Sequence, residues 1–307
     1  MGYSSRVDLF PSPMPELPDI TIYREALDAR IRGRVLQHVR IANPFLLRTA
    51  VPPITSVEGK RVLDVRRLGK RIVLAFEDDF FLVLHLMIAG RLRWLPMSAK
   101  PPARITLATF EFPDGQLALT EAGTKRRASL HCIRGRAALA AFDMGGLDIF
   151  DTDAATFAQR LLRENHTLKR ALTDPRLVSG IGNAYSDEIL HRAELSPLTL
   201  TSRLDAEDCE RLFAAARAVL DEWTQRLRAE AGDAFPEKVT AFRPEMAVHG
   251  KFGQRCPVCG APVQRIVYAE NECNYCARCQ NGGVILADRA LSRLLHKSWP
   301  RSIDDLG

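Results

Sequence analysis

Two pairs of cysteines with the same internal spacing constrain this chain more than any other feature. Cys256 and Cys259 form one C-x-x-C pair, and Cys276 and Cys279 form a second pair after 16 intervening residues. Each C-x-x-C turn can present two thiolates to one ion, and a β-hairpin between the pairs closes the other half of a tetrahedron. The spacing predicts one structural Zn²⁺ with four cysteine ligands, against a redox dithiol or chance clustering. Such a closed site has no open position, so any chemistry must lie elsewhere.

The rest of the composition is that of a folded, basic protein. The 307 residues are 46% hydrophobic and 26% charged, and 43 Lys and Arg against 37 Asp and Glu give a formal net charge of +6. A basic balance suits a polyanionic partner, although many basic proteins bind no nucleic acid. No apolar run is long enough to cross a bilayer, and no signal core follows the first residues. We therefore expect a cytoplasmic protein with no membrane partner.

Hydrophobic periodicity divides the chain into a β-rich part and a helical part. A helix opening at 15–19 should end at Gly33, and strand-like runs follow at 35–41, 61–66, 71–76, 80–87, 105–112 and 116–120. Pro-Asp-Gly at 113–115 predicts a hairpin turn. The expected fold is α+β and multidomain, with a tail or misassigned start at 1–14, a β-sandwich at 15–148 flanked by its helix, an all-α domain at 154–231, a zinc finger at 245–281 and a helical tail at 282–307.

The segment Gly-Ile-Gly-Asn at 180–183 is a second local signal. It lies between two helical stretches, and Lys169 lies one helix earlier. Glycines allow close backbone approach, and the N–H groups at the start of the following helix attract phosphate. Taken by itself, the segment is equally compatible with an ordinary interhelical loop. Its place between a lysine-bearing helix and a zinc finger favours a phosphate contact.

Several motifs follow one another in a fixed order. They are Pro-Glu-Leu-Pro-Asp at 15–19, Arg-Arg-Leu-Gly-Lys at 66–70, His-Leu at 85–86 leading to Ala-Gly at 89–90, the block 168–190, His-Gly-Lys-Phe-Gly at 249–253, and the cysteine finger. Together they resemble the formamidopyrimidine-DNA glycosylase/endonuclease VIII family over about residues 15–280. The resemblance implies a β-sandwich, a helix-two-turn-helix domain that carries the finger, and damaged double-stranded DNA between them. It implies base excision repair by a monomer associated with the nucleoid.

The resemblance also implies a catalytic group that includes Pro15, Glu16, Lys70 and Glu188. If translation starts at Met14, its removal frees a proline amine whose pKa of about 8 leaves a neutral fraction able to attack C1′ of the damaged nucleotide. The resulting iminium keeps its positive charge, so base loss and strand cleavage follow from one covalent intermediate. Glu16 would protonate the sugar ring oxygen and then shuttle protons. The competing interpretation of Glu16 is a first-turn helix charge.

A second group of residues is implied in DNA binding. A flipped nucleotide leaves a gap that an apolar side chain fills, and Met87 and Ile88 follow the motif that precedes this wedge. Buried strand residues are the competing interpretation of these two positions. The other expected DNA contacts are Lys70, Arg126, Arg127, Lys169, Asn183, Tyr185 and Asn271.

The chain departs from the family pattern near the finger tip and in the 125–129 segment. Asn271 stands where the usual form has an arginine, and an asparagine supplies no fixed charge to a phosphate. Lys-Arg-Arg-Ala-Ser at 125–129 replaces the Arg-Arg-Phe-Gly that supports the opposite base. With a short 231–247 stretch, these differences favour oxidised pyrimidines over purines as substrates. The alternative function is a non-catalytic damaged-DNA-binding protein of the same fold, and a more distant one is a zinc-ribbon protein that contacts RNA or protein.

Overall fold

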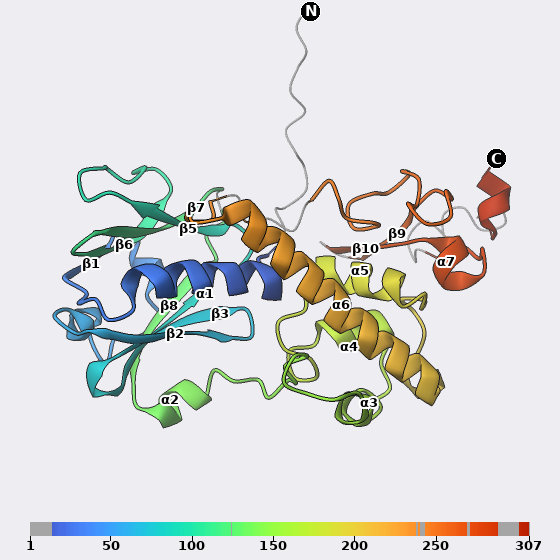
Figure 1. The fold of residues 1–307 in the computed structure, drawn as a ribbon, viewed down its shortest axis with the longest axis horizontal. Helices are drawn as coiled ribbons and strands as arrows, with labels where there is room; N and C mark the ends of the chain where they lie inside the picture. Colours follow the sequence, from blue (N-terminus) through green and yellow to red (C-terminus); the bar gives the residue numbers. More distant parts are fainter. Residues whose placement is uncertain are drawn as a thin grey trace, which may run out of the picture. The chain divides into compact units, whose positions relative to one another are not determined.

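The computed structural model describes residues 14–123, 125–237, 239, 243–268, 271–287 and 301–306. The chain forms two compact units, which Figure 1 shows in the colours of the sequence. The first unit comprises the chain up to Pro15, then 19–140 and 231–241. The second comprises 16–18, 141–230 and 242–307. The short segment 16–18 thus belongs to the second unit although the first unit flanks it on both sides.

The first unit is built on two antiparallel four-stranded sheets. Their strand orders are β1-β6-β7-β5 and β2-β3-β4-β8. The strands are β1 (His38–Ile41), β2 (Val62–Leu68), β3 (Arg71–Phe76), β4 (Phe80–His85), β5 (Gly90–Leu95), β6 (Thr106–Phe112), β7 (Gly115–Glu121) and β8 (Ser129–Arg134). Short helical elements are η1 (Pro44–Leu46), η2 (Ile54–Val57), η3 (Glu77–Asp79) and α2 (Arg136–Ala140). The expected β-rich N-terminal domain is confirmed.

Helix α1 (Leu17–Ile31) supplies one apolar face to the core of this unit. Ile20, Tyr23, Leu27 and Ile31 recur every three or four residues, and all four are fully buried. The ring of Tyr23 packs against Phe235, which belongs to the same unit, with ring centroids 5.8 Å apart. The expected N-terminal helix is therefore confirmed, and its apolar stripe explains why it folds onto the strands.

Two strands, β5 and β8, are absent from the expected set. In β5, Arg91 and Arg93 alternate with Leu92, and β8 begins two residues after the basic segment 125–127. Each strand pairs with a more apolar neighbour, β5 with β7 and β8 with β4. Tertiary pairing therefore creates strands where the local hydrophobic pattern is weak. The hairpin at 113–115 is confirmed, because Phe112 pairs directly with Gly115.

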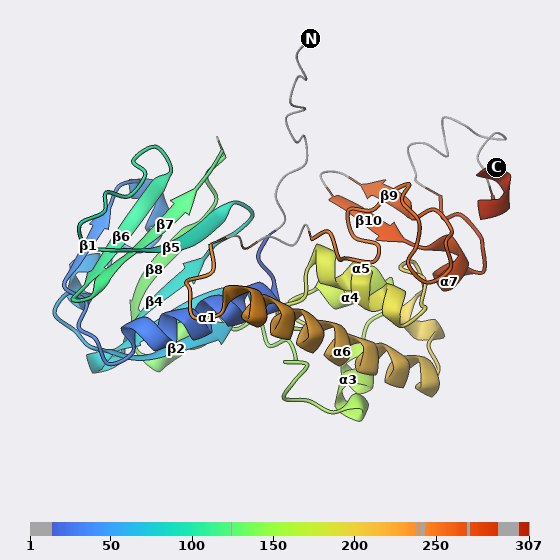
Figure 2. The same ribbon diagram turned by 45° about the horizontal axis from the view of Figure 1, so that its top comes forward.

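The second unit combines helices with a small finger. The helices are α3 (Ala154–Leu161), α4 (Leu168–Thr173), α5 (Asn183–Arg192) and α6 (Ala206–Ala231), with η4 (Thr201–Arg203) before α6. The finger contains β9 (Gln264–Tyr268), β10 (Asn271–Tyr275) and α7 (Ala277–Asn281). In both Figure 1 and Figure 2, β10 lies beside α5. The expected helical domain and the expected hairpin between the cysteine pairs are both confirmed.

The two expected tails fall mostly outside the described residues. Of the N-terminal segment, Met14 is described, and of the C-terminal tail the described parts include η6 (Ile303–Leu306). Among the described helices, none is both long and apolar enough to cross a membrane.

Candidate functional site

The carboxylate of Glu16 caps helix α5. It accepts hydrogen bonds from the backbone N–H groups of Gly182 (2.6 Å), Ala184 (2.9 Å) and Tyr185 (3.3 Å), and Glu16 is 1% exposed. A carboxylate is stabilised at a helix N-terminus by the partial positive charge of the unsatisfied N–H groups. The Gly-Ile-Gly-Asn turn therefore differs from the phosphate cradle expected from sequence, because a side chain 166 residues earlier takes these N–H groups.

Pro15 is buried and directly precedes Glu16, the residue that caps α5. In the 307-residue chain its nitrogen forms the peptide bond with Met14. An amide nitrogen has no lone pair available for attack on C1′, so this form of the chain lacks the proposed nucleophile. In a chain that began at Pro15, the proline amine would be directly bonded to the residue whose side chain is hydrogen-bonded to the start of α5.

A buried ionic cluster joins α4, α5 and the finger. The Nζ of Lys169 donates to Oδ1 of Asp187 at 2.5 Å and to the carbonyl of Asn183 at 2.6 Å. Oδ2 of Asp187 lies 2.8 Å from Nδ1 of His249 and accepts the backbone N–H of Asn274 at 3.1 Å. One carboxylate therefore serves donors from three separate segments.

The charges within this cluster depend on one another. Burial opposes ionisation of Asp187, but the Lys169 ammonium and the His249 hydrogen bond outweigh it and hold the pKa of Asp187 below its ordinary value. Lys169 is 5% exposed. It was expected on a DNA phosphate, and the structure shows that it also fastens α4 to α5.

Glu188 and Asn183 attach the finger to α5. The Glu188 carboxylate accepts the backbone N–H groups of Ala247 (2.8 Å), Val248 (2.9 Å) and His249 (2.9 Å), and burial raises its pKa. The Asn183 amide donates to the carbonyl of Glu272 in β10 at 2.9 Å. Both residues were expected in the catalytic or DNA-binding groups. In the structure Glu188 holds the segment 247–249, which precedes the first cysteine pair, and Asn183 holds β10.

Tyr185 lies in the core of the second unit instead of on its surface. Its ring is fully buried and packs edge-on against Trp223 of α6, with ring centroids 6.1 Å apart. The sequence pattern grouped Tyr185 with DNA-binding residues because it falls inside the 180–190 block. The apolar contact assigns its ring to helix packing.

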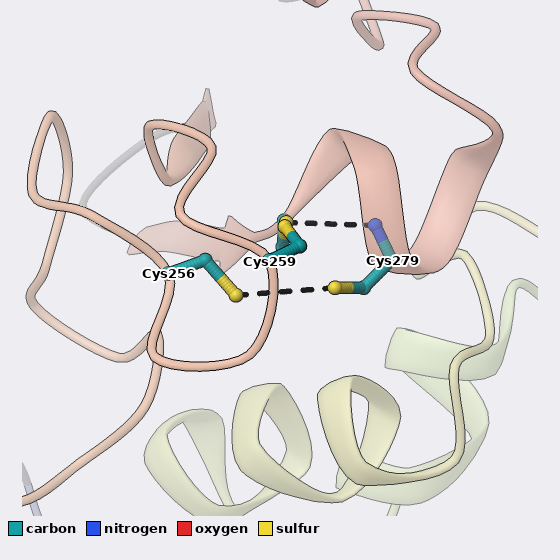
Figure 3. Close-up of side chains that lie close together, drawn as sticks. Cys256, Cys259 and Cys279 are labelled. Atoms are coloured by element: carbon teal, nitrogen blue, oxygen red, sulfur yellow. Dashed lines mark hydrogen bonds between the residues drawn. The ribbon is translucent and has the colours of Figure 1, made fainter.

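The four cysteine sulfurs of the two C-x-x-C pairs converge on one point. Their Sγ atoms all lie within 4.8 Å of one another, and Figure 3 shows Cys256, Cys259 and Cys279 directed inward. The Cys256–Cys279 and Cys259–Cys276 sulfur separations are 3.9 and 3.3 Å. Four Zn–S bonds of about 2.3 Å in a regular tetrahedron require separations of about 3.8 Å. The donor set and its spacing therefore fit one metal ion.

In the first unit, basic residues lie at the start of β3, next to the end of β4. Lys70 occupies the two-residue turn between β2 and β3, where Gly69 has a φ of +60°, and Arg71 pairs across the sheet with His85. Burial, followed by the positive charges of Arg71 and Lys70, lowers the pKa of His85 to about 4. His85 is therefore neutral at neutral pH, and the cationic side chains beside it suit a phosphate.

The turn between β4 and β5 is held in one conformation. Met87 has a φ of +54°, which is uncommon for a residue with a side chain. A Cβ on Gly90 would lie 2.2 Å from the Leu86 carbonyl oxygen. The Arg91 guanidinium donates to the carbonyls of Ile88 (3.0 Å) and Gly90 (2.7 Å). Met87 and Ile88 are half-buried in this turn and lie in neither strand, which removes their competing interpretation as buried strand residues.

The basic segment before β8 is tied back to the sheet. The buried Glu121 carboxylate accepts the backbone N–H groups of Arg127 (2.9 Å) and Ala128 (3.1 Å), and the guanidinium of Arg126 donates to the Arg104 carbonyl at 2.7 Å. Asn271 pairs with Tyr268 at the hairpin end, and its side chain lies outside the described residues.

Asp187, His249 and Arg91 are site residues to which sequence reasoning gave no role. Asp187 and His249 stand inside two of the quoted motifs, and Asp187 follows Asn183 by one helical turn. This spacing of four residues would have indicated that Asp187 lies on the same face of the helix as Asn183. No sequence signal showed that Arg91 would turn back onto the carbonyls of its own loop.

Comparisons with known proteins match both units. Residues 14–129 match the family model described as the formamidopyrimidine-DNA glycosylase N-terminal domain, and 148–229 match the formamidopyrimidine-DNA glycosylase H2TH domain. The formamidopyrimidine-DNA glycosylase of Thermus thermophilus is 33% identical over 283 residues, which cover 88% of this chain and 100% of the relative. That of Heliobacterium modesticaldum is 31% identical over 282 residues, which cover 87% and 100%.

Solved structures show the same similarity. The complex of Lactococcus lactis Fpg with DNA containing an abasic site has a TM-score of 0.76 and 26% identity, covering 87% of this chain and 99% of the other. An inhibited form of that protein bound to DNA with N7-benzyl-Fapy-dG has a TM-score of 0.78 and 27% identity, covering 87% and 100%.

Proposed function

Because this chain belongs to the formamidopyrimidine-DNA glycosylase family and is a DNA glycosylase of base excision repair, we propose that it is bifunctional. It excises an oxidised base through a Schiff base at Pro15 and then cleaves the abasic strand. The observation that carries the proposal is Glu16, which directly follows Pro15 and is held by the backbone N–H groups of Gly182 and of the first turn of α5. The complexes of the Lactococcus protein with abasic-site DNA support damaged double-stranded DNA as the partner.

The chemistry follows from the secondary amine. The neutral proline nitrogen bonds to C1′ as the base leaves with the bonding pair, and the N–H proton of the amine passes to the departing base. A proton delivered to the ring oxygen then opens the sugar and leaves the iminium. The resulting iminium withdraws electrons, so a C2′ proton is lost and the 3′ phosphate leaves with the bonding pair. Glu16 is the group that delivers and collects these protons.

The DNA contacts divide into phosphate and base-stack contacts. We assign the phosphate contacts to Lys70, at its glycine-supported turn, and to Arg126 and Arg127, with Lys169 and Asn183 contributing from the second unit. Met87 and Ile88 fill the gap left by the flipped nucleotide, since their turn is fixed by Arg91 and by the close approach at Gly90. Asn271 takes the place of a finger arginine, with a weaker grip on the phosphate.

Replacement of Glu16 by Gln tests this function in the chain that begins at Pro15. The variant is expected to lower the rate of excision of oxidised bases by at least about 100-fold while leaving DNA affinity nearly unchanged, because it removes a proton donor and no phosphate contact. Single-turnover cleavage of duplexes with an oxidised pyrimidine, an oxidised purine or no lesion measures the rate.

Loss of the α5 cap needs its own control. Asp153 also caps a helix, since it accepts the N–H of Thr156 at 2.7 Å, so Asp153→Asn measures the effect of a weakened cap without touching Glu16. A wild-type rate of excision by the Glu16→Gln variant would show that Glu16 caps the helix and takes no part in proton transfer. Tight binding to damaged duplexes with no excision by the wild-type protein would establish the non-catalytic alternative.

We also propose that the metal is one structural Zn²⁺, held by Cys256, Cys259, Cys276 and Cys279. Bound zinc supplies folding free energy to the finger, so Cys276→Ser is expected to reduce the metal from one zinc per chain to none and to unfold the finger while the β-sandwich persists. Elemental analysis and circular dichroism measure the two effects. Cys273→Ser, in the same hairpin, is the matched control and should retain the zinc. A full complement of zinc in Cys276→Ser would contradict the assignment.

A further inference from the structure

His191 reaches the cysteine cluster from outside the finger. It lies in the last turn of α5 and is 6% exposed, and its Nε2 is 3.3 Å from the Sγ of Cys256. Both residues belong to the second unit. Another donor to the cluster comes from the finger itself, since the N–H of Cys279 donates to the Sγ of Cys276 at 3.5 Å.

A hydrogen bond to this sulfur has a definite electrostatic effect once a metal is bound. Four thiolates around one Zn²⁺ carry a net charge of −2, and each sulfur accepts hydrogen bonds. A donor withdraws electron density from the sulfur, orients it toward the metal, and determines which imidazole nitrogen carries the proton. Because His191 and Cys256 are both buried, bulk water competes little for this interaction.

The two halves of the metal site are attached to the helical part by different side chains. In the second half, Gln280 accepts the N–H of Cys276 at 2.7 Å and donates to the carbonyl of Leu195 at 3.0 Å. In the first half, the equivalent link is His191 to Cys256. Each C-x-x-C turn thus has a polar attachment to α5 or to the residues that follow it.

We propose that His191 is a positioning residue of the zinc site, with its Nε2–H donating to the Cys256 thiolate and holding the first C-x-x-C turn against α5. The inference rests on the structural zinc proposed above. His191 is expected to slow the release of the metal, because the donor holds the Cys256 thiolate in place as a ligand.

Donor-free variants test the proposal through metal release and spectroscopy. His191→Phe keeps a ring of similar size but removes the donor, and His191→Leu is a second donor-free variant should the phenyl ring not fit. Zinc transfer to a chromogenic chelator is expected to be about tenfold faster or more in these variants, since partners of metal ligands are typically worth 10 to 100-fold. In the Co²⁺-substituted protein, the sulfur-to-cobalt charge-transfer band should move to lower energy.

Two further variants separate the hydrogen bond from packing. His191→Gln restores an N–H donor and should recover slow release and the wild-type band position. His38→Phe, at an exposed histidine of the first unit, should change neither. One zinc in the wild-type protein with identical release and cobalt spectra in the donor-free variants would overturn this proposal alone. A wild-type protein that binds no zinc would overturn both proposals.

Discussion

A chain that begins at Pro15 is expected to form a covalent cross-link with abasic DNA in the presence of borohydride, and the 307-residue chain is expected to form none. In the longer chain the proline nitrogen is an amide, whereas in the shorter chain it is a secondary amine with a pKa of about 8. Borohydride delivers hydride to C1′ of the iminium and makes the bond permanent. Denaturing electrophoresis measures the cross-link, and mass spectrometry confirms the first residue of each protein.

The match to the N-terminal domain model begins at Met14. Both proteins should bind the abasic duplex with measurable affinity, so that absence of a cross-link reports chemistry and not binding. Equal trapping of the two forms would move the nucleophile to a lysine, and Lys70 would be the first to test. No cross-link from the shorter form on any damaged duplex, despite binding, would favour the non-catalytic alternative.

Replacement of Asp187 by Ala is expected to destabilise the second unit by about 3–5 kcal/mol. Removal of one partner from a buried ion pair leaves the other charge uncompensated, and here the ammonium of Lys169, Nδ1 of His249 and the N–H of Asn274 all lose an acceptor. Urea denaturation measures the change. Asp208→Ala, which removes an exposed ion pair with Arg211, is the control and should change stability by less than about 1 kcal/mol.

A double-mutant cycle uses Lys169→Met, Asp187→Leu and the double variant Lys169→Met/Asp187→Leu. The double variant should be less destabilised than the sum of its single variants, because replacing a whole buried pair by apolar groups is often close to neutral. Additive single effects would show that the pair is not coupled.

The same cluster sets an acid limit on stability. The folded-state pKa of Asp187 lies below its ordinary value of about 3.9, so its contribution is present above pH 4 and is lost as the pH falls through the lower folded-state pKa. The difference in stability between wild type and Asp187→Ala should therefore narrow at the acid end.

Residues near one another in sequence were the easiest to place. The cysteine spacing located the cluster of four sulfurs and its hairpin, and the apolar period of 20–31 located α1, because each depends on local geometry. Contacts that close over long stretches of chain were not predictable in the same way. No local pattern indicates that Glu16 caps α5, or that Glu188 binds the backbone of 247–249.

Residue type was a poor guide to function at buried positions. Tyr185 follows the Gly-Ile-Gly-Asn turn and was therefore grouped with the DNA-binding residues, yet its ring is buried against Trp223. Nothing in the sequence indicated that the Lys169 ammonium is paired with Asp187. Strand β5 escaped prediction because Arg91 and Arg93 interrupt its apolar pattern, and β8 because it is short and follows the basic segment 125–127. Pairing with β7 and β4 forms both strands.

The placement of Glu16 also bears on the order in which the chain can fold. Helix α5 receives its cap from residue 16, whereas Asp187 and Glu188 receive their partners from 247–249 and Asn274. During synthesis, the hydrogen bonds of Glu16 can therefore form only after α5 has been made. Those of Asp187 and Glu188 can form only after 247–249 and Asn274 have been made. Contacts of such sequence separation slow folding, since loop closure precedes the gain from the contact. We expect the strands of the first unit, which end at Arg134, to pair first, and the second unit to become stable after its last cysteine has left the ribosome.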